Sequence, residues 1–221
     1  MKTKPFSPAT SSGRLRLRFL PAWALMAVSA AMLGGCQVLP TASPDATRFY
    51  VLSSTQPTNA VAEPAERRWQ VALRAIDLPG YLRATKSIVV REGGNELRYQ
   101  DFNRWAESLD AGISRLLVER LRREPSVRGV TAYPTRGDIP ADYEVVVRVV
   151  RCEGVAGSPG QVRFEALYSI LATDGTGRIA EEKTYVAPPV TWDGRDFSAL
   201  AAAVSAGVEE LAARIAADLP K

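Results

Sequence analysis

Side chains that could do chemistry are sparse in this chain of 221 residues. It contains no histidine and only two cysteines, Cys36 and Cys152. The absence of histidine excludes Ser-His-Asp and Cys-His nucleophile arrangements and every zinc site that needs an imidazole ligand. Two thiols also cannot build a four-sulfur metal site. We therefore expect no metal and no cofactor.

A hydrolase without histidine would need a Ser–Lys pair or two cooperating carboxylates. The three lysines beyond residue 35 do not follow a serine in S-x-x-K spacing; they are Lys86, Lys183 and Lys221. The acid pairs Glu181-Glu182 and Glu209-Glu210 are adjacent in sequence and belong to no evident cleft motif. These patterns indicate that the protein is not an enzyme.

The positive charge is concentrated at the N-terminus. The chain has 28 Lys and Arg against 24 Asp and Glu, a net charge of +4. Residues 1–35 contain five of these cations and no acid, so the rest has 23 basic and 24 acidic residues, a net charge of −1. The sequence therefore does not indicate nucleic-acid binding.

An uncharged run of 15 residues, 19–33, follows the basic segment. A transmembrane helix needs about 20 apolar residues, so this run is short for one. A positive flank followed by a short apolar core is typical of a secretory signal peptide. We expect residues 1–35 to be that signal.

The apolar run ends in Leu33-Gly34-Gly35-Cys36, which resembles the bacterial lipobox. In such lipoproteins the Cys thiol receives a diacylglyceryl group, the signal is cut before the Cys, and the new amine is acylated, typically with palmitate. Gly34 stands where Ala or Ser is commoner. The resemblance implies lipidation of Cys36, and Gln37 in place of Asp favours the outer membrane over the inner membrane.

Residues 37–47 contain two prolines and several small polar residues, which is typical of a tether. We therefore expect a lipidated tether over 36–47 and a single domain over 48–221. If Cys36 is acylated, Cys152 has no intramolecular partner. Its valine-rich surroundings predict a buried thiol, and an exposed redox thiol is the alternative.

Alternating and turn patterns predict a series of strands in the domain. The predicted strands cover residues 49–52, 69–76, 87–91, 96–100, 127–133, 143–152, 161–173 and 178–187. Turns are predicted at 92–95 and 174–177. Valine occurs at odd and even positions of 143–152, which predicts burial on both faces of that strand.

Two long amphipathic helices are predicted. Asp101 could cap the first, in which Phe102, Trp105 and Leu109 begin a stripe at steps of three and four that continues to Leu121. Asp196 could cap the second, over 197–218. We expect an α+β fold with a mixed or mostly antiparallel sheet and both helices packed on one of its faces.

Several motifs between residues 71 and 121 carry a resemblance to a known family. They are Leu78-Pro79-Gly80-Tyr81-Leu82, Arg91, Glu96-Leu97-Arg98-Tyr99 and Trp105-Ala106-Glu107. With the lipobox, the tether and the last helix, they resemble the ABC-type transport auxiliary lipoproteins of the PqiC/YmbA type. The resemblance covers nearly all of the chain after the signal.

The resemblance implies a docking or adaptor lipoprotein at the periplasmic face of the outer membrane. Its implied partners are an MCE-domain periplasmic protein and the associated ABC permease and ATPase of a lipid transport system, with a homo-oligomer as a further option. The alternative is a structural or lipid-binding envelope lipoprotein without a transporter. A closed apolar cavity would favour lipid carriage, and a filled core would favour docking.

The sequence does not locate the partner-contact face. Two exposed candidates are the turn at 78–82 and the loop at 188–195 with Trp192, and ordinary packing is an equal alternative for both.

Overall fold

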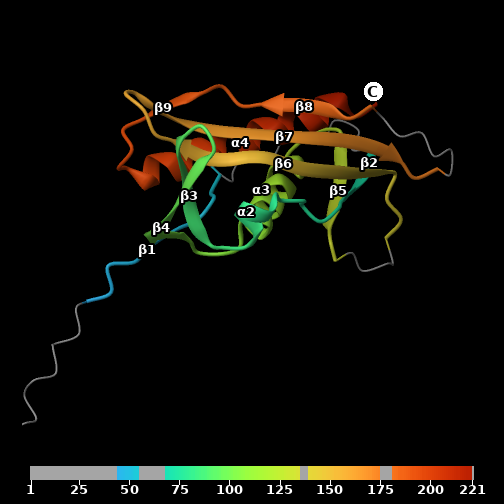
Figure 1. Ribbon diagram of the computed structural model, residues 1–221. Helices are drawn as coiled ribbons and strands as arrows, with labels where there is room; N and C mark the ends of the chain where they lie inside the picture. Colours follow the sequence, from blue (N-terminus) through green and yellow to red (C-terminus); the bar gives the residue numbers. More distant parts are fainter. Residues whose placement is uncertain (1–43, 55–67, 135–138, 175–180, 221) are drawn as a thin grey trace, which may run out of the picture. The chain divides into compact units, whose positions relative to one another are not determined.

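The computed structural model describes residues 44–54, 68–134, 139–174 and 181–220 (Figure 1). It divides the chain into two units, Met1–Asp45 and Ala46–Lys221, and all helices and strands given below belong to the second. The predicted signal peptide, Cys36 with its predicted acylation, and most of the predicted tether lie outside the described residues.

One mixed sheet of nine strands forms the framework of the second unit. Its strands are β1 (Arg48–Tyr50), β2 (Trp69–Leu73), β3 (Ser87–Gly93), β4 (Glu96–Trp105), β5 (Val127–Ala132), β6 (Tyr143–Val155), β7 (Gly160–Ala172), β8 (Lys183–Val186) and β9 (Val190–Trp192).

The long strand β6 organises this sheet. It pairs antiparallel with β7 along its whole length, whereas its other edge pairs in parallel with β2 near its start and with β3 near its end. Between those two strands, Asp77 forms a single bridge to Arg148. The segment that links β2 to β3 therefore runs alongside the middle of β6.

Parallel and antiparallel pairings are mixed throughout. β5 joins β2 and β1 joins β4 in parallel, while β3 and β4 form an antiparallel hairpin, and β8 and β9 both pair antiparallel with β7. β1 and β5 lie at opposite ends of the strand order. The expected mixed sheet is confirmed.

The predicted pair of long helices is confirmed as α3 (Leu109–Leu121) and α4 (Phe197–Asp218), and both lie against one face of the sheet (Figure 1). The Asp196 side chain caps α4, accepting hydrogen bonds from the backbone N–H groups of Ser198 at 2.9 Å and Ala199 at 3.0 Å. A Cβ atom at Gly207 would lie 3.0 Å from the Phe164 ring, so glycine lets α4 pack closely on β7. A single helical turn, α2 (Gly80–Arg83), overlaps the predicted 78–82 turn.

The predicted start of the first helix was wrong. Strand β4 continues to Trp105, because it pairs with Ser87 of β3 and with all of β1, and α3 begins only after Ser108. Asp101 therefore caps no helix, and Phe102 is exposed on a strand. Trp105 is buried as expected, but it reaches the core from β4.

The prediction that β6 is buried on both faces was also wrong. Val145, Val147 and Val149 are buried, whereas Val146 is partly exposed and Val150 is exposed. The physical reason is that α3 and α4 cover one face of the sheet, so alternate residues of β6 meet different surroundings.

The region after β7 differs in detail from the prediction. Strand β8 is shorter than the predicted 178–187, and β9 lies in what was predicted as a loop. Most of the predicted turn at 174–177 and the start of that strand lie outside the described residues.

Candidate functional site

Two residues of the sequence motifs, Tyr81 and Arg91, both contact Glu153, which lies outside the motifs. Arg91 of β3 donates two hydrogen bonds to Glu153 of β6, from Nε to Oε1 at 2.6 Å and from an Nη atom to Oε2 at 3.2 Å. The hydroxyl of Tyr81, on α2, donates to the same Oε2 at 3.2 Å. The family-like positions 81 and 91 therefore share one carboxylate.

This cluster is withdrawn from solvent. Glu153 is 1% exposed, and the Arg91 side chain is 21% exposed. Burial and the nearby Glu153 charge raise the pKa of the Tyr81 hydroxyl above its usual range. The hydrogen bond to Glu153 likewise raises the pKa of the Arg91 guanidinium. Both groups stay protonated at neutral pH, and each continues to donate to the carboxylate.

The geometry of the cluster ties three elements together. A buried carboxylate needs a cation and further donors to offset its lost hydration, and Arg91 and Tyr81 supply them. Because Glu153 lies 72 residues after Tyr81 and 62 after Arg91, this contact fixes how the segment between β2 and β3 lies along β6. The role of the cluster is therefore to hold these three elements in position.

A third motif residue, Glu107, also holds neighbouring elements in position. Its carboxylate accepts a hydrogen bond from Arg115 at 2.6 Å, and Arg115 also donates to the Leu52 carbonyl at 2.7 Å. The backbone N–H of Ala106 donates to the Tyr50 carbonyl at 2.7 Å. The Trp-Ala-Glu motif therefore holds the segment that contains β1 against β4 and α3.

The large apolar side chains of the two sequence-predicted contact faces are packed, whereas the rest of the 188–195 loop is exposed. Trp192 is 3% exposed, its indole N–H donates to the Asp196 carbonyl at 2.7 Å, and its ring lies edge-on to Phe197 at 5.4 Å. In the other candidate, Leu78 and Leu82 are buried. For Trp192 and these two leucines, the packing alternative is therefore correct.

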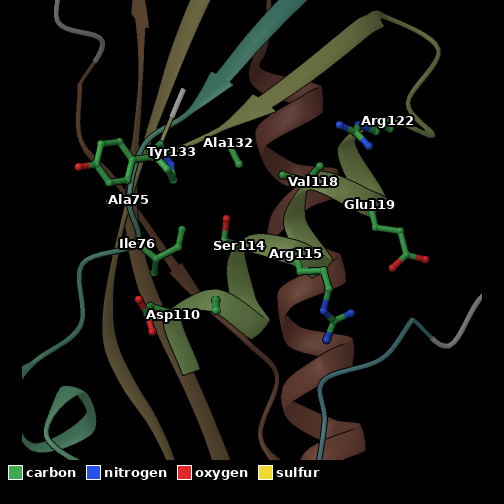
Figure 2. Close-up of a pocket in the computed structure, with 12 residues that line it drawn as sticks. Ala75, Ile76, Asp110, Ser114, Arg115, Val118, Glu119, Arg122, Ala132 and Tyr133 are labelled. Atoms are coloured by element: carbon green, nitrogen blue, oxygen red, sulfur yellow. The ribbon is translucent and has the colours of Figure 1, made fainter. Parts of the chain in front are cut away.

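Sequence reasoning missed a groove beside α3 (Figure 2). Its volume is about 780 Å³. Figure 2 shows Ile76 and Tyr133 on one side of it and α3, with Ser114 and Val118, on the other. No periodic signal could have located it, because it forms where the ends of β2 and β5 meet the exposed side of α3.

The groove combines a mainly apolar lining with a charged rim. Ala111, Val118 and Ala132 contribute small apolar surfaces, and Asp110 and Arg122 contribute charges. The groove is open to solvent, unlike a lipid cavity that encloses an acyl chain. It can accommodate a segment of another protein or a small apolar ligand along its length.

The residues considered for catalysis are mostly engaged in ordinary pairs. Lys183 pairs with Asp218 at 2.8 Å, and Glu182 accepts a hydrogen bond from Arg148 at 2.7 Å. Glu209 is buried and accepts a hydrogen bond from Ser54. Within the described ranges, no three His, Cys, Asp or Glu residues gather as metal ligands would.

Cys152 is buried, as predicted. Burial, followed by the neighbouring Glu153 charge, raises the pKa of its thiol to about 12. At pH 8 only about one thiol in ten thousand would then be the reactive thiolate. The alternative of an exposed redox thiol is not supported.

This burial predicts a slow thiol reaction in the native protein. In a Cys36→Ala chain, Cys152 is the one remaining thiol, and we expect it to resist Ellman's reagent at pH 8 until urea unfolds the domain. The absorbance of the coloured thiolate that the reagent releases measures the extent of the reaction. Full labelling of the folded chain within the time that the unfolded chain needs would contradict the buried assignment.

The second cysteine, Cys36, lies outside the described residues, so its lipidation stays a prediction. Over the residues that the structure does describe, no helix has both the length and the apolar character needed to cross a bilayer.

The fold is similar to those of solved proteins. One is protein XCC0632 from Xanthomonas campestris, of the family DUF330, with 17% sequence identity and a TM-score of 0.63 over 77% of this chain and 93% of that chain. Another is an uncharacterized protein, with 16% identity and a TM-score of 0.58 over 79% of this chain and 99% of that chain. At these identities the likeness shows the fold alone. No curated protein matches the sequence.

The family is shown by the sequence itself. The model of the ABC-type transport auxiliary lipoprotein component matches residues 50–216, which include every strand and helix from β2 to β9 and nearly all of α4. This chain belongs to that family, as the motifs around Tyr81, Arg91 and Trp105 indicated. It is therefore an auxiliary component of ABC-type transport.

Proposed function

We propose that this chain is a docking lipoprotein, anchored in the outer membrane and facing the periplasm, for an MCE-domain and ABC-type system that moves lipids between membranes. In this proposal residues 1–35 are the signal peptide, 36–47 the acylated tether and 48–221 the docking domain. Cys36 carries the lipid. The family match over 50–216 is the observation that carries the proposal.

The packing of the domain supports docking over lipid carriage. Side chains fill the space between the sheet and the helices, and one buried apolar cluster includes residues from both layers, such as Val147, Leu117 and Val208. The groove beside α3 is open and does not enclose a volume inside that cluster. A carrier would need an apolar cavity that shields acyl chains from water.

The direct test is co-purification of the complete, acylated chain with the MCE-domain protein encoded beside it. We expect a detergent-solubilised, affinity-tagged chain to retain that protein and its permease and ATPase. The Cys36→Ala chain is the matched control, and it should still bind the partner because binding belongs to the domain. An intact partner that is never retained would contradict docking and favour the structural alternative.

The anchor makes a separate prediction. The Cys36→Ala chain, exported behind a signal peptide that is cleaved without lipidation, should leave the membrane fraction and appear in the soluble periplasmic fraction, because it lacks the acyl chains that give effectively permanent attachment. Immunoblots of separated outer-membrane, inner-membrane and soluble fractions check this. A Cys36→Ala chain that stays in the outer membrane would show that another part of the protein anchors it.

A further inference from the structure

Apolar side chains are exposed where the described chain begins. Phe49 is 63% exposed, Phe102 is 59% exposed and Val51 is 50% exposed. We call these three residues the β1–β4 patch. Single exposed apolar residues are ordinary, but two phenylalanines on neighbouring strands form a surface that water solvates poorly.

The strand register places the two phenylalanines on one face. β1 and β4 are parallel neighbours, and Phe49 pairs with Arg104 (Figure 1). Phe102 precedes Arg104 by two residues and therefore shares its face. The alternate residues Tyr50 and Trp105 point the opposite way, toward the core, where the Tyr50 ring lies 6.4 Å from that of Phe197 on α4. The patch thus faces away from α4.

The patch rests on a fixed backbone. The Tyr50 hydroxyl donates to Asn103 Oδ1 at 3.1 Å, and the Tyr50 carbonyl accepts from the Ala106 N–H at 2.7 Å. Arg115 holds the Leu52 carbonyl just beyond. Phe49 and Val51 therefore sit on a strand segment tied at both sides, and little ordering is needed when the patch meets another surface.

One cation, Arg104, lies on the face of the patch, because it pairs with Phe49 and follows Phe102 by two residues. Arg48 precedes Phe49 by one residue, and Lys86 precedes Ser87, the partner of Arg104, by one residue, so both belong to the alternate face. All three cations are exposed. The exposed acid on this stretch of β4, Asp101, also belongs to the alternate face, so the patch itself is positively charged.

The covalent chain indicates what surface the patch meets. Only residues 37–47 separate Cys36 from β1. Eleven residues reach at most about 40 Å when extended, and a flexible chain of that length spans about 20 Å on average. The patch thus lies within that reach of the proposed lipid anchor. Exposed phenylalanine flanked by Arg and Lys is the chemistry of proteins that lie on anionic lipid headgroups.

We propose that the β1–β4 patch rests on the anionic lipid surface of the membrane that holds Cys36. The phenylalanines enter the interface and Arg104 contacts headgroup phosphates beside them. The contact gives the domain a defined orientation on the bilayer, with the β5 end of the strand order away from the patch. This inference rests on the proposed lipid anchor, but it does not depend on the transport partner.

The test places an environment-sensitive probe on the patch. The complete acylated chain carries Phe102→Cys labelled with the fluorophore NBD, and the matched chain carries Tyr133→Cys with the same label. Tyr133 is also an exposed aromatic residue, and it follows β5 at the opposite end of the strand order. Acylation blocks Cys36 and burial protects Cys152, so labelling is specific.

Both chains are reconstituted into vesicles of phosphatidylethanolamine and phosphatidylglycerol that contain lipids with a nitroxide on the acyl chain. We expect several-fold stronger quenching of the probe at 102 than at 133. Removing the charge of Arg104 with glutamine should shift the ratio of docked to undocked domain by about fivefold at low salt. Vesicles without anionic lipid should likewise reduce the quenching of the probe at 102.

Equal quenching at 102 and 133 in anionic vesicles would overturn the inference. So would a probe at 102 that lipid nitroxides do not reach but that is shielded by added MCE-domain protein, or by a higher density of the chain itself, since the patch would then be a protein interface. Intact-mass spectrometry of each chain first shows whether Cys36 is acylated. An unacylated Cys36 would overturn the anchor and this inference together, whereas an acylated chain without quenching would overturn this inference alone.

Discussion

Replacing Arg91 with methionine is expected to lower the free energy of unfolding by about 3–5 kcal/mol. The substitution keeps much of the side-chain volume but removes the cation that pairs with the buried Glu153 carboxylate at 2.6 Å. Tyr81 then remains as a lone hydroxyl donor to an otherwise uncompensated charge. Small domains are stable by only about 5–15 kcal/mol, so urea unfolding followed by circular dichroism should show a large shift of the midpoint.

Two further variants make this prediction specific. Arg98→Met removes a cation from the same hairpin, but the Arg98–Glu92 pair is exposed, and its loss should cost less than about 1 kcal/mol. The double variant Arg91→Met/Glu153→Leu removes both charges and should recover most of the lost stability. If Arg91→Met were as mild as Arg98→Met, the buried pair would not hold α2, β3 and β6 together.

Replacing Trp192 with alanine should cost about 3–5 kcal/mol. The indole fills the space above Gly154, where even a Cβ atom would lie 2.6 Å from the ring, and it donates a hydrogen bond to the Asp196 carbonyl that precedes α4. The substitution would leave a cavity between β6, β9 and the start of α4. The midpoint of urea unfolding measures the loss.

Val190 provides the matched control on the same strand. It is 45% exposed, so Val190→Ala should change stability by about 0.5 kcal/mol or less. A Trp192→Ala chain that unfolds like the parent but no longer retains the transport partner would show that Trp192 is a contact residue, as the sequence alone allowed. Loss of stability with partner binding preserved in the folded fraction is the expected result.

The elements with strong local signals were predictable from the sequence. α4 carries a capping aspartate, Asp196, and an apolar stripe of helical period, and both predicted its start within a residue. The alternation over 161–173 likewise predicted β7 closely. These signals lie within one segment, so no knowledge of the neighbouring elements was needed.

The start of α3 could not be read in the same way. Phe102 and Trp105 have the spacing of a helical stripe with Leu109, and Asp101 is a good capping residue. Pairing of β4 with β1, some fifty residues earlier in the chain, keeps this stretch extended. A local pattern does not contain that partner, and tertiary pairing overrides a modest helical tendency.

The central residue of the buried cluster was missed for a related reason. The family-like motifs drew attention to Tyr81 and Arg91, and a glutamate at the end of a valine-rich strand was an available signal for their shared partner. Its role depends on β3 lying beside the end of β6, a parallel pairing between segments about sixty residues apart. The groove beside α3 depends on similar long-range packing.

Docking of this domain onto the periplasmic protein of a transport system distinguishes the proposed function from lipid carriage. The most direct measurement is the binding of the purified mature Cys36→Ala chain to the purified MCE-domain protein by biolayer interferometry, with circular dichroism reporting that both are folded and native mass spectrometry reporting any lipid bound to the chain. We predict saturable binding by a chain that carries no lipid. Absence of binding to the folded partner, with phospholipid bound to the chain instead, would contradict docking and identify a lipid-binding lipoprotein.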